Sequence, residues 1–346
     1  MKIKAAIFGA SGYTGQELIR ILSGHPQVEL AAVTSRRYAG VPVADVFPSL
    51  LGLTSLTYSN ATPQEIAELC DVVFLALPHG VSMDMAPVFM QAGRKVIDLS
   101  ADYRLRDLTT YEEWYAKHHS ADLFGQAVYG LPERYRQEIK KSRLIANPGC
   151  YPTSIILGLA PALKNNLLSV STIIADSASG VSGAGRDPQV GSLFCEVDGG
   201  FKAYKVGRHR HTPEIEQELN MLAGEKFAIS FTPHLLPVKR GILSTIYATL
   251  KKDMTLPELH ALYASFYEAE KFVRICPVGT YPNLSSVCGS NYCDVGLTID
   301  PRTHRVIIIS AIDNLIKGAA GQAVQNMNLV CSLPEESGLP MAPLYP

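Results

Sequence analysis

The strongest constraint on the fold is the alternation of short apolar runs with helical patterns along the first hundred residues. Four runs have the composition of strands, and helical patterns separate them: 4–9, 28–35, 71–78 and 95–101. The run 71–78 is almost continuously apolar, as expected of a strand that is buried on both faces of a parallel sheet. The pattern therefore predicts βαβ units in a doubly wound sheet.

Two helices in this part carry local signals. In the stretch 62–70, Thr62 is followed by Pro63 and Glu65, which together are typical of a capped helix start. The stretch 82–93 predicts a helix that breaks or bends near Pro87, because proline removes a helical N–H.

The pattern changes after residue 150, where strands follow one another with few helices between them. Such a succession indicates an antiparallel or mixed sheet in a second, α+β domain. The last stretch, 314–333, predicts one long helix that returns to the first domain. We therefore expect a doubly wound α/β domain over 1–149 and 314–346, and an α+β domain over 150–313. The expected strands of the second domain are 171–180, 227–237, 241–250, 292–300 and 304–313, and its helices are 212–224 and 255–270.

Composition and charge exclude several classes of protein. The 346 residues carry a formal net charge of −1, with 18 % charged residues, so nothing attracts nucleic acid or an anionic membrane. No apolar run reaches the roughly 18–20 residues that span a bilayer. The N-terminus resembles a first strand and lacks a signal peptide, so we expect a cytoplasmic protein. The seven cysteines form no CxxC pair and are expected to be reduced.

A glycine-rich turn joins the first predicted strand to the first predicted helix. Its sequence, GASGYTG, spaces the glycines as GxxGxxG, a variant of the dinucleotide fingerprint. Small residues here let a pyrophosphate approach the N–H groups at the helix start. The alternative is a purely structural turn. The predicted cofactor-binding residues of this turn are Gly9, Ser11, Gly12, Tyr13, Thr14 and Gly15.

The end of the second strand indicates which dinucleotide is bound. Ser35, Arg36 and Arg37 stand where sites that prefer NAD usually place a carboxylate. A hydroxyl with guanidinium groups suits the 2′-phosphate of NADP, so NADP is favoured over NAD. The alternative is a solvated basic loop.

Cys150 lies in the turn NPGCYPT, between a strand-like run and an apolar helical stretch. With Pro152 at or near the first helical position, the thiol would lie beside unsatisfied N–H groups and the positive end of a helix dipole. Both favour the thiolate and lower the thiol pKa. Cys150 is therefore predicted to be a nucleophile, and the alternative is a small buried residue at a crowded turn.

Of the nine histidines, His209 and His211 form the most informative pair. They lie two residues apart, before Thr212 and Pro213, which are expected to cap and begin a helix. A histidine at a helix N-terminus tends to stay neutral and able to exchange protons near pH 7. The pair also has the spacing of half a metal site, but no companion ligand cluster is present, so no metal is predicted.

Two loops are candidates for holding an anion. Ser100 and Arg104 directly follow a predicted parallel strand, at the edge where such sheets bind ligands. The stretch 177–186 is a Ser/Gly-rich loop that ends in Arg186 and can present N–H groups and hydroxyls. Either loop is equally compatible with an ordinary flexible turn.

Together these motifs resemble the N-acetyl-gamma-glutamyl-phosphate reductases of arginine biosynthesis, within the wider aspartate-semialdehyde dehydrogenase group. The resemblance covers essentially the whole chain, and NPGCYPT with HRHTPEI is its specific part. It implies that Cys150 is the nucleophile and that His209 or His211 moves the proton, without saying which. It also implies that Arg104 binds the substrate phosphate. Further expected site residues are Pro78, Gly183 and Asn314 for the cofactor, and Asn147 and Ser182 for the substrate.

The resemblance implies an NADPH-dependent reduction of N-acetyl-L-glutamyl 5-phosphate to the 5-semialdehyde through a cysteine thioester, with release of inorganic phosphate. It also implies that 1–149 and 314–346 form the Rossmann domain that binds the dinucleotide, that 150–313 serve catalysis, substrate binding and oligomerisation, and that the protein is a homo-oligomer, either a dimer or a tetramer. A sister reductase acting on N-acetyl-aminoadipyl or aspartyl phosphate is the nearest alternative. A cysteine hydrolase or acyltransferase with a Rossmann fold, and a non-catalytic NADP-binding sensor, are more distant ones.

Overall fold

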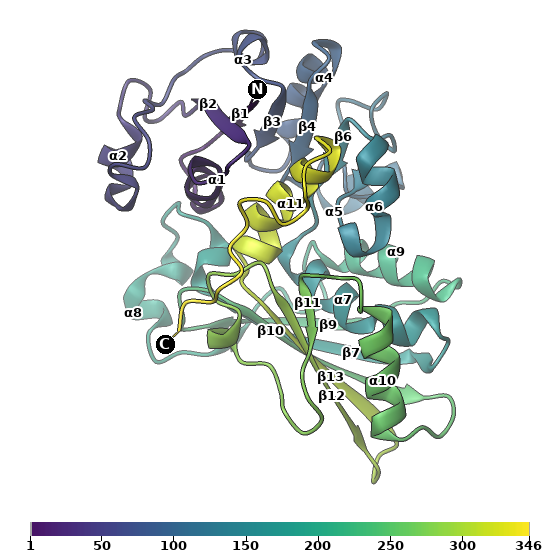
Figure 1. The fold of residues 1–346 in the computed structure, drawn as a ribbon. Helices are drawn as coiled ribbons and strands as arrows, with labels where there is room; N and C mark the ends of the chain where they lie inside the picture. Colours follow the sequence, from purple (N-terminus) through teal and green to yellow (C-terminus); the bar gives the residue numbers. More distant parts are fainter. Residues whose placement is uncertain (1, 346) are drawn as a thin grey trace. The chain divides into compact units, whose positions relative to one another are not determined.

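The computed structural model describes residues 2–345, which form two compact units. Unit 1 comprises residues 2–148 and 319–340, and unit 2 comprises 149–318 and 341–345. The chain passes from unit 2 back into unit 1 after Gly318, whereas the boundary expected from the sequence lies between residues 313 and 314. Each unit contains its own sheet, and the C-terminal helix α11 (yellow in Figure 1) belongs to unit 1.

The sheet of unit 1 has six strands in the order β2-β1-β3-β4-β6-β5, and every neighbouring pair is parallel. The doubly wound α/β architecture predicted from the sequence is therefore confirmed. The strands are β1 Ile3–Phe8, β2 Val28–Val33, β3 Val72–Leu75, β4 Lys95–Asp98, β5 Val128–Tyr129 and β6 Leu144–Ala146.

The helices of unit 1 include two groups that pack together. One group packs α1 and α6 against α11, and the other packs α3 against α4 (Figure 1). Side chains of the second group share a buried core with Ala6, Val73 and Leu75 of the strands. The helices are α1 Tyr13–Ser23, α2 Val43–Val46, α3 Pro63–Leu69, α4 Ser82–Gln91, α5 Leu108–Trp114, α6 Pro132–Lys141 and α11 Gly321–Val330, with a 3₁₀ turn at Pro48–Leu50.

The predicted start of α3 is confirmed, because Thr62 and Glu65 form a reciprocal capping box. The stretch 82–93 was predicted to break or bend near Pro87, and a break is wrong, since α4 is continuous from Ser82 to Gln91. The missing N–H of Pro87 would have bonded to the carbonyl of Met83. That carbonyl instead accepts hydrogen bonds from the hydroxyls of Tyr103 and Ser120, so the helix continues without an unsatisfied group.

The sheet of unit 2 is mixed, as predicted, with seven strands in the order β11-β12-β13-β10-β7-β9-β8. The pairs β7–β9 and β11–β12 are parallel, and the other pairs are antiparallel. The strands are β7 Leu168–Gly180, β8 Lys202–Ala203, β9 Ser230–Leu236, β10 Ile242–Leu250, β11 Val273–Ile275, β12 Cys293–Asp300 and β13 Arg305–Ile312.

Helices α7 and α10 pack on this sheet, and α9 packs on α7. The bounds are α7 Cys150–Lys164, α8 Phe194–Val197, α9 Thr212–Ala223 and α10 Leu256–Phe266, with 3₁₀ turns at Val181–Ala184, Val190–Ser192 and Leu284–Ser286. Helix α7 also passes through a proline, Pro161. The carbonyl of Leu157, four residues earlier, accepts a hydrogen bond of 2.6 Å from the Tyr267 hydroxyl instead.

The predicted single helix over 314–333 is wrong in its first turn. The chain forms a π-helix at Ile316–Ala320 before α11 begins at Gly321. The backbone N–H of Gly318 bonds to the carbonyl of Asp313, five residues back, at 2.9 Å. The Asp313 carboxylate also accepts the N–H groups of Leu315 and Ile316, which fixes this wider turn.

None of the helices among residues 2–345 is both long and apolar enough to span a membrane.

Candidate active site

The glycine-rich turn of unit 1 is closely packed at two of its glycines and open at the third. A Cβ atom at Gly15 would lie 2.3 Å from the carbonyl oxygen of Ala10, and one at Gly9 would lie 2.7 Å from that of Ala76. A Cβ atom at Gly12 would meet nothing within 4 Å. Gly12 also caps α1 without any side-chain hydrogen bond. The turn therefore packs closely inward and presents helix N–H groups outward, which fits a dinucleotide pyrophosphate.

The end of β2 lies directly beside this turn. The hydroxyl of Ser35 donates to that of Ser11 at 3.0 Å. Arg36 and Arg37 are exposed, and the Arg37 guanidinium lies 5.3 Å from the ring centre of Tyr38. The structure thus brings the two predicted cofactor segments of unit 1 together. Tyr13 and Thr14, also predicted to bind the cofactor, are partly exposed in the first turn of α1.

Pro78, Arg104 and Asn147 follow β3, β4 and β6, so they lie at the same carboxyl edge of the parallel sheet. Pro78 is exposed, whereas Arg104 and Asn147 are buried. The Arg104 side chain donates to the carbonyl oxygens of Asn147 at 2.7 Å and Leu99 at 2.8 Å. Arg104 therefore ties neighbouring strand ends together, in addition to the phosphate contact predicted for it.

In unit 2, Cys150 is the first residue of α7, and Gly149 is the N-cap. Pro152 thus stands at the third helical position, two residues beyond the expected one. No side chain caps this helix start, and Cys150 is partly exposed. The thiol therefore lies at the N-terminal end of a helix, which is the position expected of an activated nucleophile.

Two contacts fix the turn that carries the thiol. The N–H of Gly149 donates to the buried carboxylate of Glu214 in the first turn of α9, at 2.8 Å. Gly318 of the π-helix lies against Cys150 itself, since a Cβ atom at Gly318 would be 2.8 Å from the Cβ atom of Cys150. The sequence signals did not identify either contact, because both join residues that are distant along the chain.

The predicted histidines pack around Tyr151, the residue after the thiol. Its ring centre lies 5.4 Å from that of His209 and 5.9 Å from that of His211. The Tyr151 hydroxyl is 3.0 Å from that of Tyr204. His211 is the N-cap of α9, so the prediction that Thr212 caps this helix is wrong by one residue.

The two histidines differ in their hydrogen bonds. The backbone N–H of His211 donates to Nδ1 of His209 at 3.1 Å, so a neutral His209 carries its proton on Nε2. Burial, and to a smaller extent the charges of Lys205 and Arg210, lower the pKa of His209 to about 4. His209 is therefore neutral near pH 7.

Ser182, Gly183 and Asn314 form a second group in unit 2. The Asn314 amide donates to the Ser182 hydroxyl at 3.0 Å and accepts from the backbone N–H of Gly241 at 2.8 Å. A Cβ atom at Gly183 would lie 3.7 Å from Nδ2 of Asn314. The three predicted residues are thus neighbours, and Asn314 anchors the loop that carries the other two.

Among residues 2–345, no group of three or more His, Cys, Asp or Glu side chains is arranged to hold a metal ion. All seven cysteines are free thiols.

Comparison with known proteins identifies related families over nearly the whole chain. Residues 4–142 match the family described as semialdehyde dehydrogenase, NAD binding domain, and residues 150–314 match semialdehyde dehydrogenase, dimerisation domain. The chain is 59 % identical to the N-acetyl-gamma-glutamyl-phosphate reductase of Desulfotalea psychrophila, covering 99 % of this chain and 100 % of that protein. It is 56 % identical to the protein of the same name from Pelotomaculum thermopropionicum, over 100 % of both.

Solved structures share the fold at low sequence identity. Aspartate semialdehyde dehydrogenase II from Vibrio cholerae matches with a TM-score of 0.74 at 16 % identity, covering 96 % of this chain and 99 % of that one. The Candida albicans aspartate semialdehyde dehydrogenase with NADP matches with a TM-score of 0.68 at 18 % identity, over the same shares.

Proposed function

Because the chain belongs to the N-acetyl-gamma-glutamyl-phosphate reductases of the semialdehyde dehydrogenase family, we propose that it makes N-acetyl-L-glutamate 5-semialdehyde. The substrate is N-acetyl-L-glutamyl 5-phosphate, the reductant is NADPH, and inorganic phosphate is released. This reaction would place the enzyme in arginine biosynthesis.

The observation that carries the proposal is the position of Cys150 as the first residue of α7. The thiolate attacks the carbonyl carbon of the acyl phosphate, the C–O bond to phosphate breaks, and phosphate leaves with the bonding electrons. NADPH, when bound, supplies the hydride that reduces the thioester carbonyl. The N–H groups of the first helical turn stabilise negative charge on the substrate oxygen. The C–S bond then breaks, which releases the aldehyde and restores the thiolate.

We assign different roles to the two histidines. Nδ1 of His209 already accepts the N–H of His211, and the ring is neutral near pH 7. His209 therefore donates a hydrogen bond through Nε2–H and does not take up a proton. Proton transfer to and from the substrate oxygen is assigned to His211, at the N-cap of α9.

NADPH is proposed over NADH because the segment after β2 has no carboxylate and presents Ser35, Arg36 and Arg37. The double variant Arg36→Ala/Arg37→Ala is expected to raise the KM for NADPH by about tenfold or more, since it removes cations that would face the 2′-phosphate. Its KM for NADH is expected to change by less than about twofold. Equal changes for both cofactors would contradict the assignment of these arginines.

The matched family over 150–314 is described as a dimerisation domain, which supports a homo-oligomer, either a dimer or a tetramer. We propose that residues 1–149 and 314–346 serve the cofactor and that 150–313 serve the substrate and oligomerisation. The cytoplasmic location expected from the sequence stays a prediction.

The proposed function is tested in the reverse direction, by following NADPH formation from NADP, phosphate and a semialdehyde. Three substrates are compared: the semialdehydes of N-acetylglutamate, N-acetyl-aminoadipate and aspartate. The highest kcat/KM is expected for N-acetylglutamate semialdehyde, and a higher value for either rival would overturn the substrate assignment. In the forward direction, hydrolysis of the acyl phosphate to the carboxylic acid without oxidation of NADPH would favour a cysteine hydrolase instead. An active Cys150→Ser variant would contradict the covalent route.

A further inference from the structure

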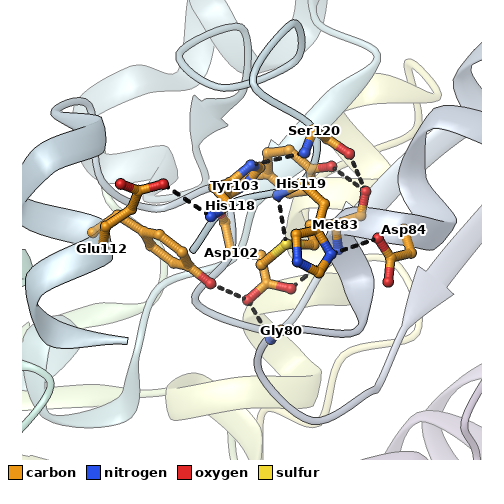
Figure 2. Close-up of polar contacts among 10 residues, drawn as sticks. Gly80, Met83, Asp84, Asp102, Tyr103, Glu112, His118, His119 and Ser120 are labelled. Carbon is orange, nitrogen blue, oxygen red and sulfur yellow. Dashed lines mark hydrogen bonds and ion pairs between the residues drawn. The ribbon is translucent and has the colours of Figure 1, made fainter. Parts of the chain in front are cut away.

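A buried carboxylate, Asp102, joins two loops at the carboxyl edge of the unit 1 sheet. Asp102 lies in the loop after β4 and is fully buried. Figure 2 shows its carboxylate beside Gly80, in the turn that follows β3. The sequence marks Ser100 and Arg104 of the same loop as candidates, and no motif marks Asp102.

Three neutral donors surround the Asp102 carboxylate. Oδ1 accepts the backbone N–H of Gly80 at 2.8 Å and the hydroxyl of Tyr111 at 2.9 Å. Oδ2 accepts the backbone N–H of Met83, in the first turn of α4, at 3.1 Å. The carboxylate therefore holds the turn after β3 and the start of α4 in a fixed relation to its own loop.

The contact with Gly80 sets the orientation of one peptide group. Residues Pro78 to Val81 form a tight turn, with the N–H of Val81 3.3 Å from the carbonyl of Pro78, and Gly80 has a φ of +86°. Because a trans peptide is planar, its N–H and C=O point in opposite directions. With the Gly80 N–H directed at Asp102, the carbonyl of His79 points away from Asp102.

A second contact strengthens this arrangement. The backbone N–H of Ala101 donates to Nδ1 of His79 at 2.9 Å, so the side chain of the turn is tied to the loop of Asp102 as well. The backbone of Asp102 is held as well, since Nε2 of His118 lies 2.9 Å from the backbone carbonyl oxygen of Asp102. Figure 2 shows His118 among these contacts, together with His119 and Ser120.

The order of the strands indicates what this turn would contact. The 2′-phosphate is assigned to the end of β2 and the pyrophosphate to the turn after β1, and the next strands in the sheet are β3 and β4. A dinucleotide that follows the carboxyl edge in this order brings its nicotinamide half to the turn after β3. The nicotinamide half is then placed against the His79–Gly80 peptide, whose orientation the Asp102 carboxylate sets.

We propose that Asp102 is a positioning residue for hydride transfer, because it fixes the His79–Gly80 peptide against which the nicotinamide is placed. The proposal rests on the proposed function. It concerns the cofactor and not the thiol of Cys150, and this difference provides the test.

The experiment uses the full-length enzyme with Asp102→Asn. The amide that replaces the carboxylate would keep one acceptor oxygen, but its NH₂ group would face one of the two backbone N–H groups, of Gly80 or Met83, that the carboxylate accepts. Two donors repel each other, so the turn is expected to shift. We expect a weaker Kd for NADPH, a kcat lowered by about tenfold or more, and a larger kinetic isotope effect with deuterated NADPH. The rate of Cys150 alkylation by iodoacetamide without cofactor should change by less than about twofold.

The matched control is Tyr111→Phe, which removes one donor to the same carboxylate and leaves both backbone contacts. Its Tm is expected to fall, whereas its kcat and isotope effect should stay close to those of the wild type. If Asp102→Asn lowers Tm without changing these kinetic values, or if Tyr111→Phe changes them equally, the positioning role is overturned.

A second pair of variants keeps the test valid if Asp102→Asn does not fold. Gly80→Ala strains the turn because Gly80 has a positive φ, which alanine rarely adopts. The substitution leaves the Asp102 side chain unchanged, and the space at the Cβ position of Gly80 is open. Gly93 has a φ of +79° and the same open space, but it follows α4 and lies outside the turn. Gly80→Ala is expected to weaken NADPH binding and raise the isotope effect, and Gly93→Ala is not. Equal effects of the two would overturn the proposal.

Binding of NADPH is measured without substrate, so it separates the two proposals. Weaker NADPH binding by Asp102→Asn in a protein that reduces none of the three acyl phosphates would support the role of Asp102 and contradict the proposed function. Normal binding and kinetics in Asp102→Asn, in an active enzyme, would contradict the role of Asp102 alone.

Discussion

Replacing Gly318 by alanine tests how closely the π-helix holds the nucleophile. The φ of Gly318 lies outside the left-handed region, so alanine is compatible with the backbone there. The added Cβ atom would lie 2.8 Å from Cβ of Cys150 and 3.3 Å from both Cα of Cys150 and Cδ1 of Ile312. Since carbon atoms pack at about 3.5–4.0 Å, Cys150 or the π-helix must move by roughly 1 Å.

The size of the effect follows from this displacement. Overpacking of a close contact costs about 1–3 kcal/mol of stability. A shift of about 1 Å at a reacting atom lowers the rate by roughly 100-fold, which is close to 3 kcal/mol of transition-state stabilisation. Gly318→Ala is therefore expected to fold with a lower Tm and to lose about two orders of magnitude in kcat/KM for the semialdehyde, while its Kd for NADPH stays unchanged.

The assay compares kcat/KM, Tm and the alkylation rate of Cys150 in Gly318→Ala and in Gly191→Ala. Gly191 is a suitable control because it also belongs to unit 2 and has only the tip of the Lys202 side chain at 4.0 Å. The control should retain wild-type values. A Gly318→Ala enzyme within threefold of wild-type kcat/KM would refute the view that this contact positions the thiol.

Three further predictions test separate groups. Glu214→Ala leaves the buried N–H of Gly149 without its acceptor, so the free energy of unfolding in urea should fall by about 1–3 kcal/mol. The rate of Cys150 alkylation should change as well, and an unaltered rate would contradict a role of Glu214 in positioning the turn. His209 should stay neutral in an NMR titration down to about pH 5, because burial and nearby cations hold its pKa at about 4, and a midpoint near 6.5 would contradict this. Burial and the neighbouring Asp102 raise the pKa of Asp98 from 3.8 to about 6, so its contribution to stability is lost as the pH rises through about 6. Asp98→Asn should therefore be less destabilising at pH 8 than at pH 4.5, and equal losses of stability at the two pH values would refute the raised pKa.

The elements that the sequence predicted well are those with strong local signals. The helix at Thr62 was predicted because its capping residues all lie within four positions of one another. The parallel strand at 71–78 was predicted from its continuous apolar run, although the structure shortens it to Val72–Leu75. Both signals are local, so they do not depend on which segments meet in the fold.

The errors arise where a distant group overrides the local pattern. Helix α4 continues past Pro87 because hydroxyls of Tyr103 and Ser120 satisfy the carbonyl that the proline leaves free. The π-helix was missed because apolar periodicity does not distinguish it from an α-helix over a single turn, and the Asp313 carboxylate determines it.

The same distinction applies to the candidate site. Cys150 and the histidine pair were found because short motifs mark them. Glu214, Gly318 and Asp102 act through contacts with residues that are distant in sequence, and no single-sequence pattern shows such contacts. Sequence therefore indicates which groups react, whereas the structure indicates which groups hold them.

The most direct test of the central claim is to trap the acyl enzyme on Cys150. The enzyme is mixed with N-acetylglutamyl phosphate in the absence of cofactor, quenched in acid and examined by peptide mass spectrometry. We predict one N-acetylglutamyl group on the peptide that contains Cys150, and its loss as semialdehyde when NADPH is added before the quench. Turnover to semialdehyde without any acyl group on Cys150 would contradict the account.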